Sequence, residues 1–537
     1  MRKLETIQRR KLASAYGGFG SIVETKENGS LKIDDYDRWP CFSARQLRLY
    51  RQNRVDDSRL LRSLQNEYPT LSFLYPIPTD DLKDKIWSAR GTEISSTKSA
   101  SYFPTWFFCP KCRKLHRLSD WEAEWNNIFP TDNRFRENYP ACAYCSSLLQ
   151  NGKIKRRSLE QIRFCMASLE SGDITDVPFE KLFDQNVVLG GEDTACDISN
   201  VQPNNVDLEY HTSASSDGLQ SINIVSGNRA ISMAQIARPF IVDNRQTGNH
   251  QFTPTAYKVL LRNGNNIYYP NVISRLYIPW DANRQLNPGE SYDYQEYLYI
   301  TEDNGYIYGV KSATDFYSVR YDNFSHRFIK KFFAIHRLKE NSVIPSYTRV
   351  SSRYNRWWNI STNSVSDRMN PGHVQARSIT SPNHFLPVVE LYGEGLFMDI
   401  NIDNINMDDR YKFVHTLSHI IMKELEFQCG YPLSSLKEKI YKTDDQTIYG
   451  ILIYTVGGSE GGYGGLVSLL PTDPMANDGG DLIRLIDNAF ERAKDCPNDP
   501  ICEEEGAHCY ACADIPEISC CNWNEDLDRR VINRYNH

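Results

Sequence analysis

The run GAHCYACADIPEISCCNWNEDLDR, residues 506–529, is the stretch that organises the C-terminal end of this chain. Six of the 14 cysteines lie in the 26 residues from Cys496 to Cys521, and Cys509 and Cys512 stand in C-x-x-C spacing. Two intervening residues let both sulfurs turn toward one tetrahedral ion at about 2.3 Å while the backbone reverses. This density of cysteines predicts a metal-binding segment.

The expected occupant is a structural zinc ion, because four thiolates satisfy the charge and the tetrahedral geometry of Zn²⁺ without a water ligand. The expected ligands are Cys502, Cys509, Cys512 and Cys520, with Cys496 as the substitute. The alternative is a set of unrelated buried thiols, since free cysteine packs as a small hydrophobic residue. A set of disulfide bonds fits less well, because the composition of the whole chain indicates the cytoplasm, where cysteines stay reduced.

Composition describes an ordinary globular protein. The 537 residues are 40% hydrophobic and 24% charged, and this length suits roughly three to four domains. No apolar run approaches the roughly 20 residues of a membrane helix, and the opening MRKLETIQRRKL lacks the apolar segment of a secretory signal. We therefore expect a cytoplasmic protein, in which reduced, clustered cysteines bind metal more often than they pair.

A second cysteine pattern lies in the N-terminal part. The segment YFPTWFFCPKCRKLHRL holds Cys109 and Cys112, and YPACAYC holds Cys142 and Cys145 about 30 residues later. This C-x₂-C…C-x₂-C spacing presents four thiolates on two turns. It predicts a zinc ribbon over residues 109–145 and a second structural Zn²⁺.

Basic residues and one histidine surround this predicted ribbon. His116 could replace a thiol, but with four cysteines present we expect it to be a surface residue. Lys111, Arg113, Lys114 and Arg117 suit contact with nucleic acid. Zinc ribbons equally serve as protein-docking modules, so both interpretations stay open.

We expect a mixed α/β (α+β) multidomain protein with three consecutive regions. Residues 1–150 would form an N-terminal domain with the ribbon, residues 151–386 a strand-rich middle region, and residues 387–537 a C-terminal α/β domain that ends in the cysteine-rich zinc site. Alternating Val, Ile, Tyr and Phe predict strands in the middle region at 222–226, 240–242, 258–262, 267–279 and 297–301.

The C-terminal region has the clearest periodicity. Residues 388–400 predict two short strands about a Gly-rich turn, and residues 448–455 predict a buried strand. Apolar residues at helical spacing predict one helix over residues 411–430, which stops at a glycine, and another over residues 481–493.

One stretch, residues 320–358, combines cations with aromatic rings in a chain whose net charge is −7. A surface of that charge does not attract a polyanion, so contact with nucleic acid would come from a local patch or a basic partner. Interleaved cations and aromatics can follow phosphates and stack bases. The favoured interpretation is an amphipathic helix with a Phe core face and a solvated Lys/Arg face, and the two interpretations can coexist. The candidate DNA-binding residues are Arg320, Arg327, Lys330, Lys331, Arg337, Arg353 and Arg356.

Two glycine-rich segments could bind anions. In YGGFGSIVE, residues 16–24, the Lys-Ser/Thr of a P-loop is missing, so a tight turn packed against a strand is the favoured interpretation. After the strand predicted at 448–455, the loop Gly457–Gly465 leaves backbone amides open. That loop could hold a phosphate or a carboxylate, or it could be a flexible connector between domains.

His415 and His419 are four residues apart on a predicted helix and therefore share one side of it. Such a pair can bind zinc, but a catalytic H-E-x-x-H motif would have Glu where this chain has Thr416. A packed or hydrogen-bonded histidine pair is therefore favoured over a catalytic metal site.

Taken together, these segments resemble the DrmB family of the bacterial DISARM anti-phage defence systems. The resemblance rests on YGGFGSIV, FPTWFFCPKC, YYPNVISRLYIP, VELYGEGLF, HTLSHIIMKEL, GILIYTVGGSEGGYGGLVSL and the cysteine-rich end. It implies that the C-terminal part is similar to a domain of unknown function at the end of certain DNA helicases, where its cysteines hold zinc. It also implies a large helicase-like ATPase of the DrmA type as partner, in a complex that binds DNA and acts on phage DNA.

Two features depart from the family pattern. The family often has further zinc-like cysteines in its middle region, whereas Cys165 and Cys196 lack C-x-x-C partners here, so no middle zinc site is expected. The Cys520–Cys521 doublet leaves the last C-terminal ligand ambiguous by one residue.

These observations predict a non-catalytic accessory subunit that binds the helicase-like ATPase and helps it engage DNA. The chain has no Walker A motif, no H-E-x-x-H and no paired H-x-K nuclease signature, so no catalytic residue is expected. The alternative is a metal-dependent enzyme acting on nucleic acid through His415, His419 and the loop 457–465, which would need an open coordination position. A stand-alone sensor of modified DNA is a third option, which the acidic net charge disfavours.

Overall fold

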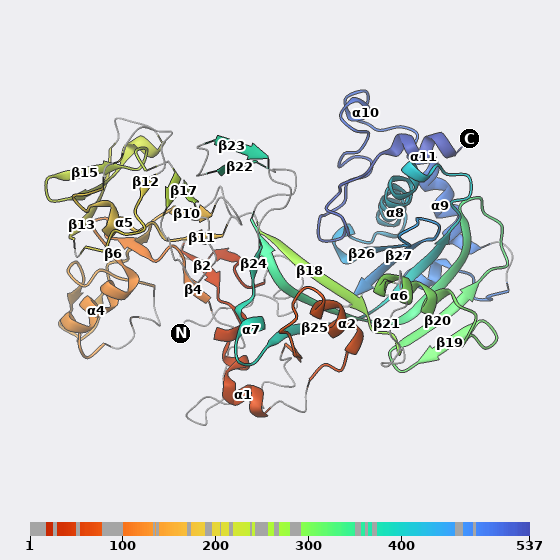
Figure 1. Cartoon of the computed structure of the whole chain (residues 1–537), viewed down its shortest axis with the longest axis horizontal. Helices are drawn as coiled ribbons and strands as arrows, with labels where there is room; N and C mark the ends of the chain where they lie inside the picture. Colours follow the sequence, from red (N-terminus) through yellow and green to blue (C-terminus); the bar gives the residue numbers. More distant parts are fainter. Residues whose placement is uncertain are drawn as a thin grey trace. The chain divides into compact units, whose positions relative to one another are not determined.

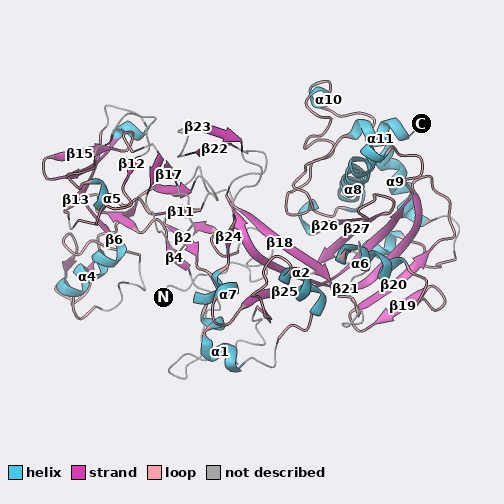
Figure 2. Cartoon of the chain, viewed as in Figure 1, coloured by secondary structure: helices cyan, strands magenta, loops and turns pink. Residues whose placement is uncertain are grey.

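The computed structural model shows a mixed α/β protein (Figure 1), in which strands outnumber helices (Figure 2). The residues that the structure describes are 18–24, 29–49, 54–77, 100–132, 135, 139–168, 173–187, 189, 196–204, 206–213, 218–236, 239–241, 256–261, 268–279, 291–349, 356–359, 364–367, 373–456, 465–475 and 479–536.

The chain divides into two compact units, each assembled from separate stretches. The first unit takes Met1–Gln52, Ile77–Val272 and Ile344–Leu386, and the second takes Asn53–Pro76, Ile273–Val343 and Pro387–His537. The mixed α/β class is confirmed. The division into three consecutive domains stays a prediction.

The first unit is built from several small sheets, in which all pairings are antiparallel except that of β12 with β16. The strand orders are β1 (Ile22–Glu24), β2 (Ser30–Ile33), β4 (Ala100–Tyr102); β11 (Ile174–Thr175), β10 (Phe164–Ser168), β17 (Ala256–Leu261), β16 (Pro239–Ile241), β12 (Cys196–Asp197); β15 (Arg229–Ser232), β14 (Ile222–Ser226), β13 (Leu208–Thr212), β6 (Lys114–Arg117), β5 (Trp106–Phe108), β9 (Glu160–Gln161); β7 (Ser147–Leu148), β8 (Ile154–Lys155); and β22 (Arg356–Asn359), β23 (Ser364–Asp367).

The first unit also contains short helices, and aromatic side chains are part of its buried clusters. The helices are α1 (Ala44–Leu49), α4 (Leu118–Ile128), α5 (Phe179–Leu182) and α7 (Arg377–Thr380), with 3-10 turns η2 (Tyr36–Arg38), η3 (Pro40–Phe42) and η4 (Gly218–Ser221). Trp106 packs edge-on against Phe179, with ring centroids 5.3 Å apart, and its indole N–H donates to the carbonyl of Val177 at 2.8 Å. The buried indole therefore keeps its polar group satisfied.

The second unit is organised around a nine-stranded sheet, some of whose strands extend beyond that unit, and its path from β19 to β26 is antiparallel throughout. The strand order is β19 (Val310–Ala313), β20 (Phe316–Tyr321), β21 (Ile329–Thr348), β25 (Phe385–Ile400), β27 (Tyr449–Val456), β26 (Leu436–Lys442), with β18 (Tyr269–Leu276) and β24 (Val374–Gln375) paired to β21, and β3 (Phe73–Pro76) paired to β25.

Helices of this unit end where local sequence signals place them. Asp57 caps α2 (Ser58–Gln65) by accepting from the amide of Leu60, and Ser291 caps α6 (Tyr292–Thr301) in the same way. The long helix α8 (Met407–Cys429) stops at Gly430, whose φ of 73° is the left-handed conformation that glycine adopts readily. The remaining helices are η6 (Leu433–Ser435), η7 (Leu466–Leu469), α9 (Gly480–Arg492), α10 (Ile501–Glu504) and α11 (Arg529–Tyr535).

Neighbouring residues of the long strands enter two different cores. Phe332 and Met398 pack in the cluster that contains the apolar face of α8, whereas Phe333 and Phe397 pack with Tyr297 of α6. Successive side chains point to opposite faces of a sheet, so a strand that is covered on both faces needs apolar residues at consecutive positions. This two-sided burial explains the continuous apolar runs of β21 and β25.

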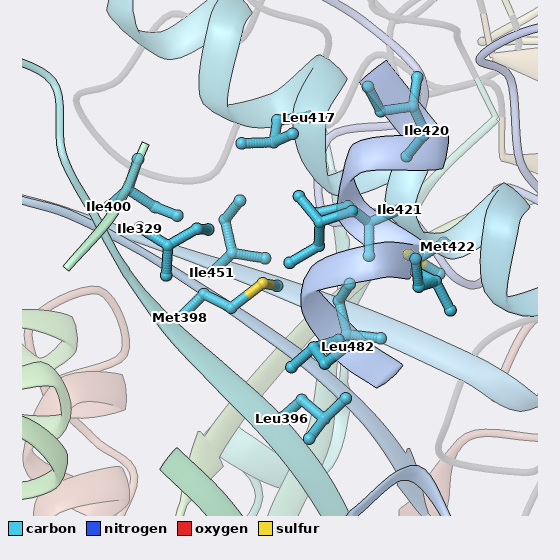
Figure 3. Packing of buried hydrophobic residues seen from close by; sticks show 14 of the residues in the cluster. Ile329, Leu396, Met398, Ile400, Leu417, Ile420, Ile421, Met422, Ile451 and Leu482 are labelled. Carbon is cyan, nitrogen blue, oxygen red and sulfur yellow. The ribbon is translucent and has the colours of Figure 1, made fainter. Parts of the chain in front are cut away.

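Figure 3 shows the α8 side of this sheet from close by. Ile329, Met398 and Ile451 come from three neighbouring strands, and Leu417 and Ile421 of α8 belong to the same buried cluster. None of the described helices is both long enough and apolar enough to cross a membrane.

Most predicted elements are confirmed. The strands expected at 222–226, 240–242, 258–262 and 267–279 are present as β14, β16, β17 and β18, with shifts of one or a few residues at some ends. The helices expected at 411–430 and 481–493 are α8 and α9, and the strand expected at 448–455 is β27.

Three predictions about local structure are wrong. Residues 297–301 lie in helix α6 and not in a strand, because Ser291 caps the helix and Tyr297 and Ile300, three apart, both reach the core. Residues 320–358 do not form an amphipathic helix, since β20, β21 and β22 occupy most of their described part. Residues 388–400 belong to one continuous strand, β25.

Gly395 contributed to the prediction of a turn within β25, but its role is to allow the close approach of a neighbouring strand. A Cβ on this residue would lie 2.8 Å from Cβ of Tyr454 on the neighbouring strand β27. The glycine is therefore required by the close approach of two strands, a role that glycine also plays in sheets.

Candidate metal centres

Four sulfur atoms of the predicted ribbon lie together in the first unit. The ligand atoms of Cys109, Cys112, Cys142 and Cys145 all lie within 4.8 Å of one another, and Sγ of Cys112 is 3.7 Å from Sγ of Cys142. Sulfurs bound to one tetrahedral zinc at about 2.3 Å would be about 3.8 Å apart. The spacing therefore fits a single Zn²⁺.

Two backbone turns present these sulfurs. β5 leads into Cys109, whose amide donates to the carbonyl of Lys114 at 3.0 Å where β6 begins. Arg113, with a φ of 64°, closes this turn by donating its amide to the carbonyl of Cys109 at 2.8 Å. The second turn starts at Cys142, whose carbonyl accepts from the amide of Ser146 at 3.1 Å. The geometry is that of a two-turn ribbon.

An aromatic core supports the ribbon. Trp121 and Trp125 of α4 are fully buried in the cluster that also contains Cys109 and Cys142. The indole N–H of Trp121 donates to the carbonyl of Phe107 at 2.9 Å, which attaches α4 to β5. Side-chain packing therefore positions the sulfurs.

His116 takes no part in this sulfur group. Its ring packs edge-on against Trp121, with centroids 4.9 Å apart, and its Nε2 lies 3.7 Å from the carboxylate of Glu124. The side chain is only 17% exposed, so it is a packed residue more than a surface one.

The basic residues around the ribbon differ in their surroundings. Arg117 forms an ion pair with Glu180, and the Lys114 ammonium lies 4.4 Å from the centroid of the Tyr144 ring. Lys111 and Arg113 are exposed. These contacts do not distinguish between the two predicted roles of the ribbon, nucleic-acid contact and protein docking.

The C-terminal cysteines form a second group of four sulfurs, with one member different from the expected set. The group consists of Cys496, Cys502, Cys509 and Cys512. Three of its sulfur–sulfur distances are 3.6 Å, 3.7 Å and 3.8 Å, again the separation expected on one zinc ion.

The expected fourth ligand, Cys520, lies elsewhere. Its sulfur is 3.3 Å from Nε2 of His415, and Cys496 takes its place in the four-sulfur group. The reason is the compact loop after α9, in which the amide of Asp499 donates to the carbonyl of Cys496 at 2.9 Å and that of Cys502 donates to Asn498 at 3.0 Å. This loop places Cys496 and Cys502 beside the Cys509–Cys512 turn.

Amide groups of Asn498 donate to two of these sulfurs. The amide of Asn498 donates to Sγ of Cys496 at 3.4 Å, and its side-chain amide donates to Sγ of Cys509 at 3.4 Å. Burial raises the pKa of the Cys509 thiol, but the amide of Ala511, the Asn498 side chain and the neighbouring thiols outweigh burial and lower it to about 7. A thiol of this pKa is readily deprotonated for metal binding.

Arg529 of α11 fixes the loop that carries Cys496. Its guanidinium is 3% exposed, forms an ion pair with Asp499, and donates to the carbonyl of Lys494 at 3.0 Å. The other role of Asp499 is to accept from the amide of Cys496 at 2.9 Å. Burial acts to lower the pKa of Arg529, but the Asp499 carboxylate outweighs burial and raises this pKa above its usual value, so the guanidinium is firmly charged.

Each four-sulfur group offers a complete tetrahedral set of soft donors. Zinc bound by four thiolates has no position left for water or substrate, and such sites are structural. Both groups therefore fit a structural Zn²⁺, and the ligand sets that the geometry supports are Cys109, Cys112, Cys142 and Cys145, and Cys496, Cys502, Cys509 and Cys512.

The isolated cysteines of the middle region are packed in cores. Cys165 lies in β10 and shares a buried cluster with Phe103, and Cys196 lies in β12 in the cluster around Phe240. Neither belongs to a metal-binding group among the residues that the structure describes.

The phenylalanines that the structure describes in the stretch 320–358 lie in the core or pack against it. Phe328, Phe332 and Phe333 are 3% exposed or less, so they cannot stack on nucleic-acid bases. The neighbouring cationic residues differ in solvent exposure, because some positions of β21 face the core and others face solvent.

The cations of this stretch fall into two sets. Arg320 pairs with Asp303 and Asp322, and Lys331 lies 3.9 Å from the carboxylate of Asp303. The exposed set is Arg327, Lys330 and Arg337. Arg353, the side chain of Arg356 and the glycines 457–464 lie outside the described residues.

His415 and His419 are fully buried, and Nε2 of each lies 3.1 Å from Oε1 of Glu438 on β26. Glu438 is not among the residues predicted from the sequence. Its signal is the alternation Leu436, Glu438, Ile440, which puts a carboxylate on the apolar face of a strand.

Comparison with known proteins supports zinc binding by the C-terminal group and the resemblance. The family model described as "Domain of unknown function (DUF8724)" matches residues 8–269, which include the ribbon cysteines. The model described as "MrfA Zn-binding domain" matches residues 417–513, which include the second four-sulfur group.

A curated relative is similar to this chain over part of its length. The DISARM protein DrmB of Bacillus paralicheniformis is 27% identical over 241 residues, which are 37% of this chain and 39% of that protein. The resemblance expected from sequence is thus confirmed, over less than half of either protein. A solved structure of the DUF1998 helicase MrfA bound to DNA aligns with 42% of this chain and 26% of its own, at 11% identity and a TM-score of 0.22, which is too low to establish a common fold.

Proposed function

We propose that this chain, similar to the DISARM protein DrmB, is a non-catalytic accessory subunit of a bacterial anti-phage defence complex in the cytoplasm. In this proposal it binds a helicase-like ATPase partner and helps that partner engage DNA. The observation that carries the proposal is the match to DrmB, which covers 37% of the chain.

The two zinc sites support an architectural role. Each would hold one Zn²⁺ through four thiolates, and each is attached to a buried core, through Trp121 in the first unit and through Arg529 in the second. A metal held by four protein ligands stiffens the surrounding backbone and supplies no reactive water. The sites therefore suit surfaces that must keep their shape when a partner docks.

The DNA contact that we propose involves fewer kinds of interaction than the sequence suggested, because base stacking by the phenylalanines is lost. The buried phenylalanines cannot stack on bases, so the exposed Arg327, Lys330 and Arg337 would act on phosphates alone. Phosphate contacts position a duplex without reading its sequence. We therefore propose a weak, salt-dependent and sequence-independent contribution to DNA binding.

The alternative of a metal-dependent enzyme that acts on nucleic acid is not favoured by the geometry. His415 and His419 are 0% exposed, and a catalytic metal needs a position that water or substrate can reach. A phosphodiester could not approach the two imidazoles without opening the core around α8.

The test of the proposal is reconstitution with the helicase-like ATPase encoded in the same defence system. We expect the two proteins to co-elute and the ATPase rate or the DNA affinity of the partner to change when this chain is added. As a control, the purified chain without its partner should neither hydrolyse ATP nor cut DNA. Separate elution with an unchanged ATPase rate and DNA affinity would refute the accessory role, and DNA cleavage by the purified chain would refute its non-catalytic character.

A further inference from the structure

A third cluster of metal-binding side chains lies in the second unit, apart from the two four-sulfur groups. It consists of His415 and His419 of α8, Glu438 of β26 and Cys520 of the C-terminal segment. The ligand atoms of all four lie within 4.8 Å of one another, and the first three side chains are buried. The Zn-binding family model covers residues 417–513 and so includes neither His415 nor Cys520.

The four side chains converge on one point. Nε2 of His415 and Nε2 of His419 each lie 3.1 Å from Oε1 of Glu438, and Nε2 of His415 is also 3.3 Å from Sγ of Cys520. Donors of one tetrahedral zinc, at about 2.0–2.3 Å from the ion, would be about 3.3–3.6 Å apart. The observed separations are close to these values.

The hydrogen bond at Nδ1 of His419 determines whether Nε2 of the same ring carries a proton or a lone pair. Nδ1 of His419 lies 2.8 Å from the carbonyl oxygen of Ala513, which can only accept, so Nδ1 carries the proton. In the neutral ring Nε2 then offers a lone pair, and it faces a second acceptor, Oε1 of Glu438. A cation between the two atoms turns this repulsion into attraction. A second shell in which a backbone carbonyl holds Nδ1–H is typical of zinc-binding histidines.

A buried ion pair is the competing explanation, and it accounts for less of the geometry. A protonated His419 could donate to Glu438, but the second imidazole, His415, converges on the same oxygen atom. Meanwhile Oε2 of Glu438 and Nδ1 of His415 are buried without a hydrogen-bond partner among the described residues. Pairwise hydrogen bonding would spread the contacts over both oxygens, whereas a shared ion draws the donors toward one point.

Cys520 has the surroundings of a metal thiolate. Its sulfur accepts from the amides of Asn522 and Asn524, both at 3.2 Å. The first of these contacts, from the residue two positions later, repeats that between Asn498 and Cys496 in the four-sulfur group. The structure therefore also decides the Cys520–Cys521 doublet: Cys520 contributes sulfur, while Cys521 donates its amide to Oε1 of Glu438 at 3.1 Å.

We infer that His415, His419, Glu438 and Cys520 bind a third Zn²⁺ in a closed, structural site. Two imidazole nitrogens, one carboxylate oxygen and one sulfur complete a tetrahedron, and this mixed set of donors suits zinc among the common divalent ions. The ion would join α8, β26 and the C-terminal segment at one point. The site goes beyond the proposed accessory function and does not depend on it.

Metal counting on the intact full-length chain tests this inference directly. After dialysis against a weak chelator, we expect native mass spectrometry and elemental analysis to give three Zn²⁺ per chain. The variants Glu438→Gln and Cys520→Ala should each give two, and the matched control Cys429→Ala, an exposed cysteine on α8, should give three. Two zinc ions in the unmodified chain, or three in both variants, would overturn the inference.

A second measurement needs no variant and therefore does not depend on whether the variants fold. In the chain with ¹⁵N-labelled histidine, zinc binding leaves His419 with a proton on Nδ1 and none on Nε2. A buried ion pair instead gives an imidazolium with protons on both nitrogens. NMR spectra that show the doubly protonated ring at neutral pH would contradict the zinc site, and a singly protonated ring with a zinc-shifted Nε2 would support it.

Discussion

The carbonyl oxygen of Ala513 accepts a hydrogen bond from Nδ1 of His419 at 2.8 Å. Ala513 directly follows Cys512, so this bond links the C-terminal four-sulfur group to the middle of α8, the longest helix. The amide of Glu438 on β26 also donates to the carbonyl of Ser519 at 3.0 Å. The cysteine-rich end is thus attached to both a helix and a strand of the second unit, and loss of its metal should affect the core.

The first prediction concerns the C-terminal zinc. Replacing Cys512 with Ser should remove one Zn²⁺ per chain and destabilise the second unit by several kcal/mol, since binding of structural zinc contributes about 10 kcal/mol or more to folding in small domains. Zinc content and chemical unfolding followed by Trp fluorescence measure the two effects. Cys429→Ser, an exposed cysteine outside the group, is the control and should leave both unchanged. Full zinc content in the Cys512 variant would show that this sulfur is not a ligand.

The second prediction concerns Arg529 as a positioning residue for the same site. Arg529→Met removes the ion pair with Asp499 and the hydrogen bond to Lys494, and so loosens the loop that carries Cys496. We expect about a 10-fold loss of zinc affinity, the effect typical of residues that hold ligands in place. Competition with a chromophoric chelator measures it. Arg530→Met, whose side chain is 45% exposed and pairs with Asp528, should behave like the unmodified chain.

The third prediction concerns two glycines of the second unit. Gly395→Ala should destabilise the protein by about 3 kcal/mol, because the new methyl group would lie 2.8 Å from Cβ of Tyr454 on a neighbouring strand that cannot move aside. Gly430→Ala should cost only about 1 kcal/mol, because it strains a residue of φ 73° but meets nothing within 4 Å. Urea unfolding of both variants gives the comparison. Equal losses would mean that the two strands separate more easily than the structure indicates.

The fourth prediction concerns Glu340, which is 1% exposed. Burial raises its pKa, but the Lys437 ammonium at 3.0 Å and the Tyr454 hydroxyl at 2.8 Å outweigh burial and hold it below the usual 4.5. The unfolded chain therefore takes up the proton first as pH falls. The stability that Glu340 contributes is complete above about pH 4.5 and is lost as pH falls through the folded-state pKa.

Glu340→Gln tests this dependence. The variant should be less stable than the unmodified chain at neutral pH, and the difference should shrink as pH falls below 4.5. Comparing the two proteins at each pH cancels the effect of acid on the zinc sites. Glu491→Gln, at a carboxylate that is 67% exposed, should show no such trend. A difference that stays constant with pH would mean that the Glu340 pKa does not change on folding.

The fifth prediction concerns DNA. Lys330→Glu should weaken DNA binding of the reconstituted complex and lower the slope of log affinity against log salt by about one, the change expected for one phosphate contact. The control Lys442→Glu makes the same charge change at an exposed residue of β26, a strand that β25 and β27 separate from β21, which carries Lys330. This control should leave the slope unchanged. Equal slopes for both variants would remove the residues around Lys330 from the DNA interface.

Local signals in the sequence were sufficient for several elements. The glycine stop and apolar spacing predicted α8, and β-branched runs predicted β14 and β27, because periodicity of 3.6 or 2 reflects a single element and its buried face. C-x-x-C spacing predicted both sulfur groups for the same reason, since the turn that brings two sulfurs together is only a few residues long.

The sequence by itself thus determined that this is a mixed α/β protein with two four-cysteine groups. The tertiary structure decided which sulfur completes the C-terminal group, that Cys520 joins His415, His419 and Glu438, and that the phenylalanines near residue 330 are core. These outcomes depend on contacts between residues far apart in the chain, such as Cys520 with His415. Spacing along a chain specifies what lies within one turn or one strand, whereas the packing of helices and strands specifies which distant side chains meet.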